Sequence, residues 1–195
     1  MSAVDIAGGN VDTLTESNNV IENCFIQRTS QKSFWESLSI RGCGVTVRNN
    51  NISVSPQQAI RPWGSLHMIE YNELYDVLRE NDDCGFIYWG GNSLLRGTMV
   101  QYNYFHDASS IEPMVYNAKA AIYWDDGQSG MSAQYNIIAN IAGRGLFSNG
   151  AGATLHRYNT SVNLDREWHF ADHPKRDTEI VTDDVFATIA DTMKD

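Results

Sequence analysis

The sequence has little of what membrane, disulfide-rich and nucleic-acid-binding proteins need. Its longest apolar run, residues 120–124, is far shorter than the roughly 18 to 20 residues of a membrane-spanning helix. The three cysteines, Cys24, Cys43 and Cys84, form no C-x-x-C pair, so we expect neither a disulfide framework nor a zinc site. Only 14 Lys and Arg stand against 24 Asp and Glu, and a net charge of −10 repels phosphate. We therefore expect no membrane span and no nucleic-acid partner.

The composition is that of a folded body rather than a disordered segment. Of 195 residues, 42% are hydrophobic and 19% charged, with only 4 Pro, so the chain can bury a core. The first nine residues contain no basic segment followed by an apolar one, so we expect no secretory signal peptide in this chain.

An asparagine repeat organises the sequence. Tyr-Asn followed by an apolar or acidic residue begins at Tyr71, Tyr102 and Tyr135, and Tyr158 continues the series. The asparagines lie between 22 and 33 residues apart: Asn23, Asn50, Asn72, Asn103, Asn136 and Asn159. Apolar residues predominate three positions before and two positions after them, so those positions are expected to face a shared interior.

Short β-prone strings recur between the asparagines, at residues 85–89, 120–124 and 145–148. Strands with a period near 22 residues and no helical pattern between them predict a solenoid whose stacked coils share one core. We predict an all-β fold, a right-handed parallel β-helix of about six coils over residues 1–165. Each asparagine is expected at a left-handed turn, with its amide stacked on the next coil.

The end of the sequence departs from this pattern. Val185, Ile189 and Met193 recur at helical spacing, so the segment 182–195 is predicted to be a C-terminal helix, helical from 182 to 194. Residues 166–181 are predicted to be a polar linker.

The first coil has no segment that would cover it. A solenoid exposes strand edges and apolar residues at an uncapped end. We therefore expect residues 20–26 to be exposed at their leading edge and the isolated chain to self-associate at this N-terminal edge.

Five strings carry a resemblance to a known family: residues 19–23, 68–77, 82–88, 102–107 and 122–130. Within a region from about residue 8 to 163, they resemble a bacterial family of right-handed parallel β-helix repeat proteins with a pectin lyase-like fold. The family includes glycoside hydrolases of the α-L-fucosidase and xylanase type. The resemblance implies a carbohydrate-active protein, with the chain a core fragment or short relative of a secreted parent, extracellular or periplasmic.

For the hydrolases, the resemblance implies acid and nucleophile or base roles for Asp83 and Asp125, with Asp126 as the alternate. Such carboxyls lie about 5 to 5.5 Å apart for retention or about 6.5 to 9.5 Å apart for inversion. Asp83 precedes its strand and Asp125 follows the equivalent strand. Extended backbone would therefore separate them by roughly 20 Å, so residues 79–84 must curl back over the face. A turn or a solvated acidic loop is the simpler interpretation of these aspartates.

No cofactor is required by this chemistry, and calcium is an alternative ligand for the adjacent acidic side chains of Asp125 and Asp126. Otherwise no metal site is expected.

Candidate substrate contacts are aromatic strand residues and two histidines: His67, Tyr88, Trp89, His106, Tyr123 and Trp124. Strand alternation places either the two tyrosines or the two tryptophans outside. An external Trp89–Trp124 pair would form a platform for a sugar ring, whereas an internal pair would be core packing. The histidines are interpreted either as proton shuttles or sugar contacts, or as structural residues.

The expected partner is a polysaccharide or oligosaccharide, and glycoside hydrolysis is the leading hypothesis. A polysaccharide lyase would need a basic residue such as Arg61, Arg96, Lys119 or Arg144, in a chain whose negative charge repels uronate polymers. A non-catalytic glycan-binding or structural solenoid is favoured by Gln57 and Gln58, where many relatives have a histidine.

Overall fold

The computed structural model describes residues 2–31, 35–92, 94–108, 116, 118–171, 180–182 and 184–187. Within them the chain is all-β, with strands β1 to β19 and no helix. No helix in this described part is long and apolar enough to cross a membrane. The strands belong to two curled sheets in which neighbouring strands are parallel.

The larger sheet has two arms that meet at the long strands β15 (Ile137–Asn149) and β17 (Thr160–Ala171). The first arm contains β1 (Val4–Gly8), β4 (Leu38–Cys43), β7 (Ile60–Ser65), β10 (Gly85–Gly90) and β13 (Ala120–Asp125). The second arm contains β3 (Phe25–Gln27), β6 (Asn51–Ser53), β9 (Glu73–Tyr75) and β12 (Tyr104–Ala108), and β19 (Val185–Ala187) pairs with β17.

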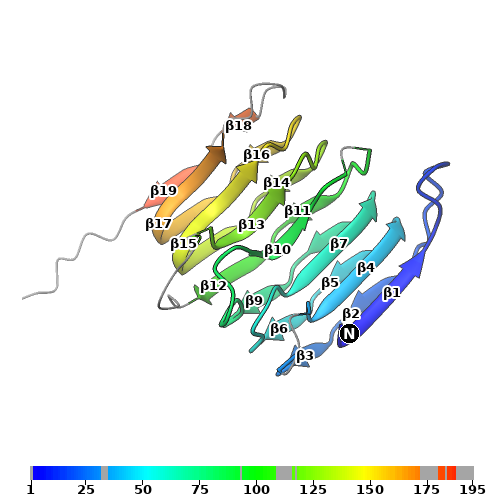
Figure 1. Ribbon diagram of the computed structural model, residues 1–195, viewed down its shortest axis with the longest axis horizontal. Helices are drawn as coiled ribbons and strands as arrows, with labels where there is room; N and C mark the ends of the chain where they lie inside the picture. Colours follow the sequence, from blue (N-terminus) through cyan, green and yellow to red (C-terminus); the bar gives the residue numbers. More distant parts are fainter. Residues whose placement is uncertain are drawn as a thin grey trace, which may run out of the picture.

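The smaller sheet adds one strand for each turn of the chain. Its strands are β2 (Val20–Glu22), β5 (Thr46–Arg48), β8 (Met68–Glu70), β11 (Met99–Gln101), β14 (Ser132–Gln134), β16 (Leu155–Arg157) and β18 (Ile180–Thr182). In both sheets the strands follow one another along the long axis in chain order, an arrangement compatible with a solenoid (Figure 1). Aliphatic residues at matching register positions, such as Val47, Ile69 and Val100, form the buried core between the sheets.

A ladder of buried asparagines links successive turns. The Nδ2 of Asn50, Asn72, Asn103 and Asn136 each donates to the Oδ1 of the next asparagine, at 2.9 to 3.1 Å. The first turn differs from the expectation, because β2 pairs with β5 so that Cys24, not Asn23, takes the ladder position. The repeat therefore identified five of the six members correctly.

The left-handed backbone position is one residue earlier than expected. It is occupied by the residue before each ladder position, and its φ lies between 53° and 57° in these six turns: Asn23, Asn49, Tyr71, Tyr102, Tyr135 and Tyr158. Non-glycine residues are disfavoured at such angles, although asparagine tolerates them better than most. The tyrosines offset this cost by stacking their exposed rings on one another, which we call the tyrosine ladder.

The predicted C-terminal helix is wrong where the structure describes it. Ile180–Thr182 is strand β18 and Val185–Ala187 is strand β19, each paired in parallel with the preceding turn. The predicted linker is also shorter than expected, because β17 continues to Ala171 against β15. The remainder of the predicted helix, residues 188–195, lies outside the described residues.

The N-terminal edge is open among the described strands, since β1, β2 and β3 each pair on one side only. Phe25 in β3 is 81% exposed, and Val20 in β2 is also exposed. We expect the isolated chain to self-associate through this edge, so the mass measured by light scattering should rise with protein concentration. A constant monomer mass at high concentration would contradict this expectation.

His67 lies inside the fold and cannot contact a sugar, contrary to one interpretation of the sequence. Its side chain is 1% exposed, the backbone N–H of Val45 donates to Nδ1 at 3.2 Å, and Nε2 has no partner among the described residues. Burial lowers the pKa of His67 to about 4, and burial likewise lowers the pKa of His156 to about 4.

These two histidines should make the protein acid-labile. The unfolded imidazole has a pKa near 6.5, so the unfolded chain binds protons first and the free energy of unfolding falls as pH decreases from about 6.5 to about 4. Each histidine contributes up to ~3 kcal/mol to this loss. Urea unfolding across this range should show the decline, and His67→Gln should weaken it. A flat wild-type profile would refute the account.

Candidate active site

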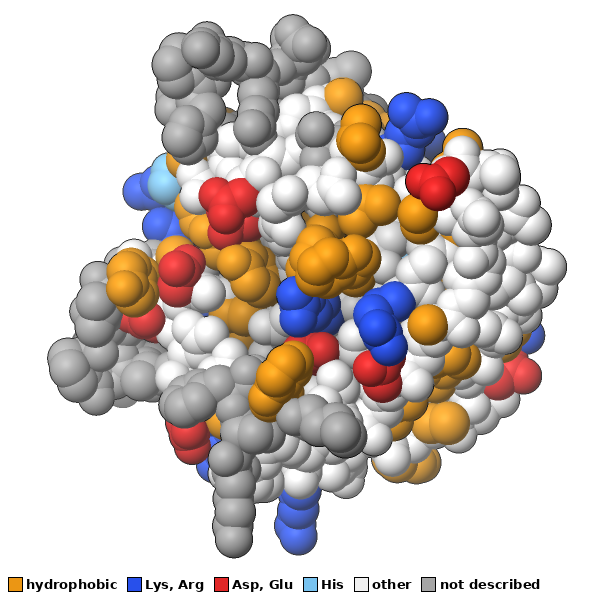
Figure 2. Space-filling model, turned by 45° about the vertical axis from the view of Figure 1, so that its right-hand side comes forward, with side chains coloured by type: hydrophobic (Ala, Val, Ile, Leu, Met, Phe, Trp, Pro, Cys, Tyr) orange, Lys and Arg blue, Asp and Glu red, His pale blue; other side chains and the backbone are white. Residues whose placement is uncertain are grey.

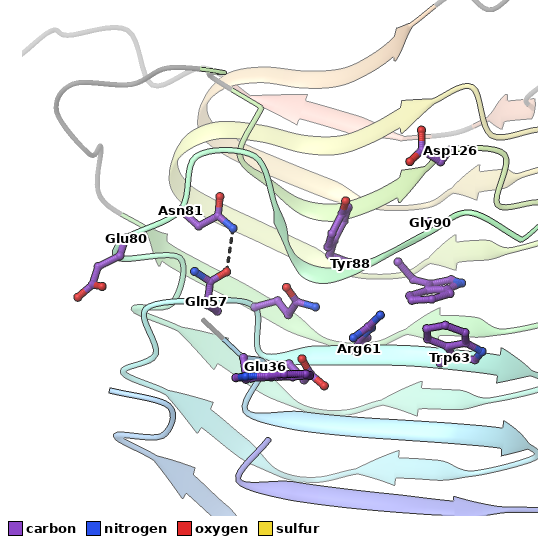
Figure 3. A pocket seen from close by; sticks show the side chains of 12 residues that line it. Glu36, Gln57, Arg61, Trp63, Glu80, Asn81, Tyr88, Gly90 and Asp126 are labelled. Atoms are coloured by element: carbon purple, nitrogen blue, oxygen red, sulfur yellow. Dashed lines mark hydrogen bonds between the residues drawn. The ribbon is translucent and has the colours of Figure 1, made fainter. Parts of the chain in front are cut away.

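A cavity of about 760 Å³ opens on the outer surface of the first arm. Its walls come from the segments preceding β4 and β7, from β7 and β10, from the loop after β9 and from the residue after β13. The lining residues are Trp35, Glu36, Gln57, Gln58, Arg61, Trp63, Glu80, Asn81, Tyr88, Trp89, Gly90 and Asp126. Figure 2 shows one face of the molecule on which hydrophobic side chains lie beside acidic and basic ones, and Figure 3 shows the cavity itself.

The floor of the cavity is a cationic aromatic cluster. The rings of Trp63 and Trp89 lie 4.0 Å apart between centroids, tilted by 44°. The guanidinium carbon of Arg61 lies 5.0 Å and 4.7 Å from these two centroids, a cation–π arrangement. Figure 3 shows Arg61 lying between Trp63 and Tyr88. No carboxylate among the described residues forms an ion pair with Arg61, so its N–H donors remain open to a ligand.

Neutral amides and one buried acid form a wall of the cavity. Asn81 Nδ2 donates to Gln57 Oε1 at 2.8 Å, which ties the loop after β9 to the first arm (Figure 3). Gln58 Oε1 accepts a hydrogen bond from Cys84 Sγ at 2.9 Å. Glu36 is buried and accepts from Ser2 Oγ at 2.8 Å. The wall therefore offers amide donors and acceptors of the kind that orient hydroxyl groups.

Asp125 is held rigidly beside this cavity. Its side chain is 7% exposed, and its Oδ2 accepts a hydrogen bond from the Tyr88 hydroxyl at 2.9 Å. Its Oδ1 accepts from Asn149 Nδ2 at 2.8 Å and from the backbone N–H of Asp126 at 2.9 Å. Three donors from three turns of the chain thus fix the orientation of this carboxylate.

The structure brings Asp83 to the same face. Tyr123 donates to Asp83 Oδ1 at 3.4 Å, and the rings of Tyr123 and Tyr88 pack with centroids 4.9 Å apart. Asp83 and Asp125 therefore accept hydrogen bonds from two tyrosines whose rings pack on one another. We call the row of packed rings to which Tyr88 and Tyr123 belong the outer aromatic stack. Because these two rings pack on one another, Asp83 lies closer to Asp125 than the roughly 20 Å expected for extended backbone.

The electrostatics of the site favour the protonated form of Asp83. Burial raises the pKa of Asp83, the nearby charge of Asp125 raises it further, and the hydrogen bond from Tyr123 partly opposes this. Burial and the charge of Asp125 also raise the pKa of Tyr88 and of Tyr123, so both phenols remain protonated donors. A carboxyl with a raised pKa is suited to donate a proton.

The outer aromatic stack continues past the acidic pair. Phe147 packs on Tyr123 and His169 packs on Phe147, with centroids 4.3 Å and 4.8 Å apart.

Two basic residues proposed for a lyase reaction lie near this stack or inside the fold. Arg144 donates from Nε to His169 Nδ1 at 3.0 Å, and Lys119 is fully buried, with burial lowering its pKa to about 8. Neither basic residue lines the cavity, and of the lyase candidates only Arg61 does.

Several predicted site residues lie elsewhere. Trp124 is completely buried in the core, so the external Trp89–Trp124 platform does not form, and Trp89 packs on Trp63 instead. His106 lies on the second arm, where its Nδ1 is 2.8 Å from Asp107 Oδ2 and its Nε2 is 3.3 Å from Glu73 Oε1.

No group of three or more metal-binding side chains occurs in the described part of the chain, and calcium at Asp125 and Asp126 stays a prediction.

The sequence interpretation missed Trp63, Glu36 and Asn149 as site residues. A signal for Asn149 was present, because Asn149 follows the repeated string at 145–148 as Asp125 follows the string at 120–124. Trp63 could have been found by aligning Ala59-Ile60 with Phe86-Ile87, since Ile60 pairs with Ile87. Glu36 carried no repeat signal.

Comparisons with protein-family models, with curated proteins and with solved structures found no match. What this site does is therefore inferred from its geometry.

The raised pKa of Asp83 has a consequence for stability. A raised folded-state pKa means that stability is greatest below the unfolded pKa, near 3.9, and is lost as pH rises through the folded value. We expect Asp83→Asn to be more stable than wild type at neutral pH and the difference to close in acid. Urea unfolding at both pH values measures this, with the exposed Asp12→Asn as control. Equal stability of Asp83→Asn and wild type at neutral pH would disprove it.

Proposed function

We propose that the chain is a right-handed parallel β-helix that binds a glycan along its first arm and hydrolyses a glycosidic bond there. The stacked turns, the parallel strand pairing and the asparagine ladder support the fold. The sequence resemblance to β-helical glycoside hydrolases agrees with the activity. The observation that carries the activity is that Asp83 and Asp125 accept hydrogen bonds from adjacent tyrosines, Tyr123 and Tyr88, of which Tyr88 lines the cavity.

The chemistry assigns a different role to each carboxyl. Asp83, whose pKa burial raises, donates a proton to the glycosidic oxygen as the bond from that oxygen to the anomeric carbon breaks. Asp125 either removes a proton from the attacking water or attacks the anomeric carbon itself. In the second case water later releases the sugar and Asp83 takes up the proton of that water. Both routes end with one water molecule added across the cleaved bond.

The cavity supplies binding. Trp63 and Trp89 present aromatic surface to the apolar face of a sugar ring, while Arg61 and the neighbouring amides contact its hydroxyls. The elongated face of the first arm suits a chain of several sugars rather than a single small ligand.

A panel of fucosylated and xylan-type oligosaccharides tests this function. Release of new reducing ends from any of them by the wild-type protein is the expected result. Binding without cleavage, or no interaction at all, would reject hydrolysis.

A non-catalytic glycan-binding role is the second candidate. It is favoured by the saturation of Asp125, whose two oxygens already accept three hydrogen bonds, and by the neutral side chains of Gln57 and Gln58 in the cavity wall. In that case Trp63→Ala should weaken glycan retention in affinity electrophoresis while no glycan is cut.

A further inference from the structure

The tyrosine ladder ends in an open hollow on the far side of the fold from the candidate active site. The hollow has a volume of about 520 Å³ and is lined by Asn23, Cys24, Phe25, Asn49, Asn50, Asn51, Tyr71 and Glu73. These residues lie in strands β3, β6 and β9 of the second arm and in the turns that join them to the smaller sheet, and none of them lines the cavity of the first arm.

The hollow exists because the ladder lacks its first two rungs. The rings of Tyr71, Tyr102, Tyr135 and Tyr158 stack with centroids 5.0 to 5.1 Å apart and planes within 15° of parallel. In the two preceding turns the same left-handed position holds Asn49 and Asn23, whose side chains are too short to continue the stack. Tyr71 is accordingly 53% exposed, against 40–42% for the other three.

The surroundings of the open Tyr71 ring are amphipathic. Phe25 adds exposed apolar surface, and Asn49 adds a side-chain amide. Asn51 Nδ2 donates to Glu73 Oε2 at 2.6 Å, so an oriented carboxylate lies at the rim. An aromatic face bordered by amides and a carboxylate complements a ring that has an apolar face and hydroxyls around its edge.

We propose that this hollow is a second glycan-binding site, in which a neutral pyranose ring stacks on Tyr71 as the missing rung of the ladder. Its hydroxyls would bond Asn49, Asn51 and Glu73. The carboxylate of Glu73 selects against uronate or sulfated sugars, because a second negative charge there would be repelled. The site contains no catalytic pair and does not depend on hydrolysis at the first arm.

Cys24 provides a built-in reporter of occupancy. It lines the hollow and is exposed, whereas the other two cysteines, Cys43 and Cys84, are buried. Its rate of alkylation by iodoacetamide, followed by mass spectrometry at protein concentrations where the chain is monomeric, should fall when a sugar fills the hollow. The probes are xylohexaose, cellohexaose and a fucosylated xyloglucan oligosaccharide, with an oligogalacturonate as the anionic comparison.

Two variants separate binding from folding. The double variant Asn23→Tyr/Asn49→Tyr adds both missing rungs at backbone angles that tyrosine already adopts at Tyr71, so it should fold and abolish protection of Cys24. Tyr71→Ala should weaken protection at least about tenfold in apparent Kd. Tyr135→Ala, which removes a ring from the middle of the ladder, is the matched control and should protect as wild type does.

At least one neutral probe is expected to slow alkylation of wild-type Cys24, and the oligogalacturonate to leave it unchanged. The proposal is overturned if no neutral probe slows alkylation, if Asn23→Tyr/Asn49→Tyr is protected as well as wild type, or if only the anionic probe protects. Because cleavage is measured separately, any of these results would leave the assignment of Asp83 and Asp125 standing.

Discussion

Replacing Asn103 with alanine is expected to lower the free energy of unfolding by roughly 3–5 kcal/mol. The side chain accepts from the backbone N–H and the Nδ2 of Asn72, and it donates to the carbonyl of Ile69 and to Asn136 Oδ1. Alanine leaves these buried partners without their hydrogen bonds, and each unsatisfied group costs about 1–3 kcal/mol. Since folded domains are stable by only about 5–15 kcal/mol, the variant should be near the limit of folding.

Urea unfolding followed by circular dichroism measures this loss. The matched control is Asn19→Ala, which removes one exposed amide bond to the carbonyl of Ala7 and should cost less than about 1 kcal/mol. Similar losses in the two variants would show that the buried ladder does not hold the turns together.

Asp125→Asn is expected to reduce kcat/KM for glycan hydrolysis by about 10²- to 10⁴-fold, the range that a positioned acid–base group contributes. The amide keeps the shape of the side chain. Its oxygen can still accept from Asn149 Nδ2 and the Asp126 N–H, and its Nδ2 can donate to the Tyr88 hydroxyl, so folding should be retained. It can neither take up a proton at neutral pH nor form a glycosyl ester. The measurement is the initial rate of reducing-end release, with Asp12→Asn as the control. Equal rates for Asp125→Asn and wild type would remove Asp125 from the mechanism.

The repeat was readable from the sequence because stacking imposes the same residue type at the same place in every turn. Asn72, Asn103 and Asn136 satisfy one another, so each turn needs an amide there. The error in the first turn arose because Asn23 and Asn49 occupy the left-handed position, where asparagine is also tolerated. Two different physical reasons thus favour the same residue type at adjacent positions.

The C-terminal prediction failed because a short apolar pattern does not distinguish a helix from a strand. Val185 and Phe186 pair with Thr160 and Ser161 of β17, and the hydrogen bonds of that pairing outweigh the helical spacing. Pairing with strand β17 of the previous turn determines this conformation. The sequence of residues 182–195 alone does not reveal that pairing.

The acidic site could be predicted only in part, because the path of a loop is not encoded in strand periodicity. The sequence led us to predict a role for Asp83 and Asp125, but the hydrogen bond from Tyr123 to Asp83 depends on how the loop folds. The Arg61–Trp63–Trp89 cluster arises from contacts between adjacent turns. Such contacts follow from the exact strand register, which the sequence indicated only approximately.

The most direct test of the account is the leaving-group dependence of Asp83→Asn. An aryl glycoside with a good leaving group, built on the sugar released from the oligosaccharide panel, needs no proton donor for bond cleavage, whereas a natural glycosidic oxygen does. The account predicts that Asp83→Asn loses activity on the oligosaccharide but retains most of its activity on the aryl glycoside. An equal loss on both substrates, or no loss on either, would contradict the assignment of Asp83 as the acid.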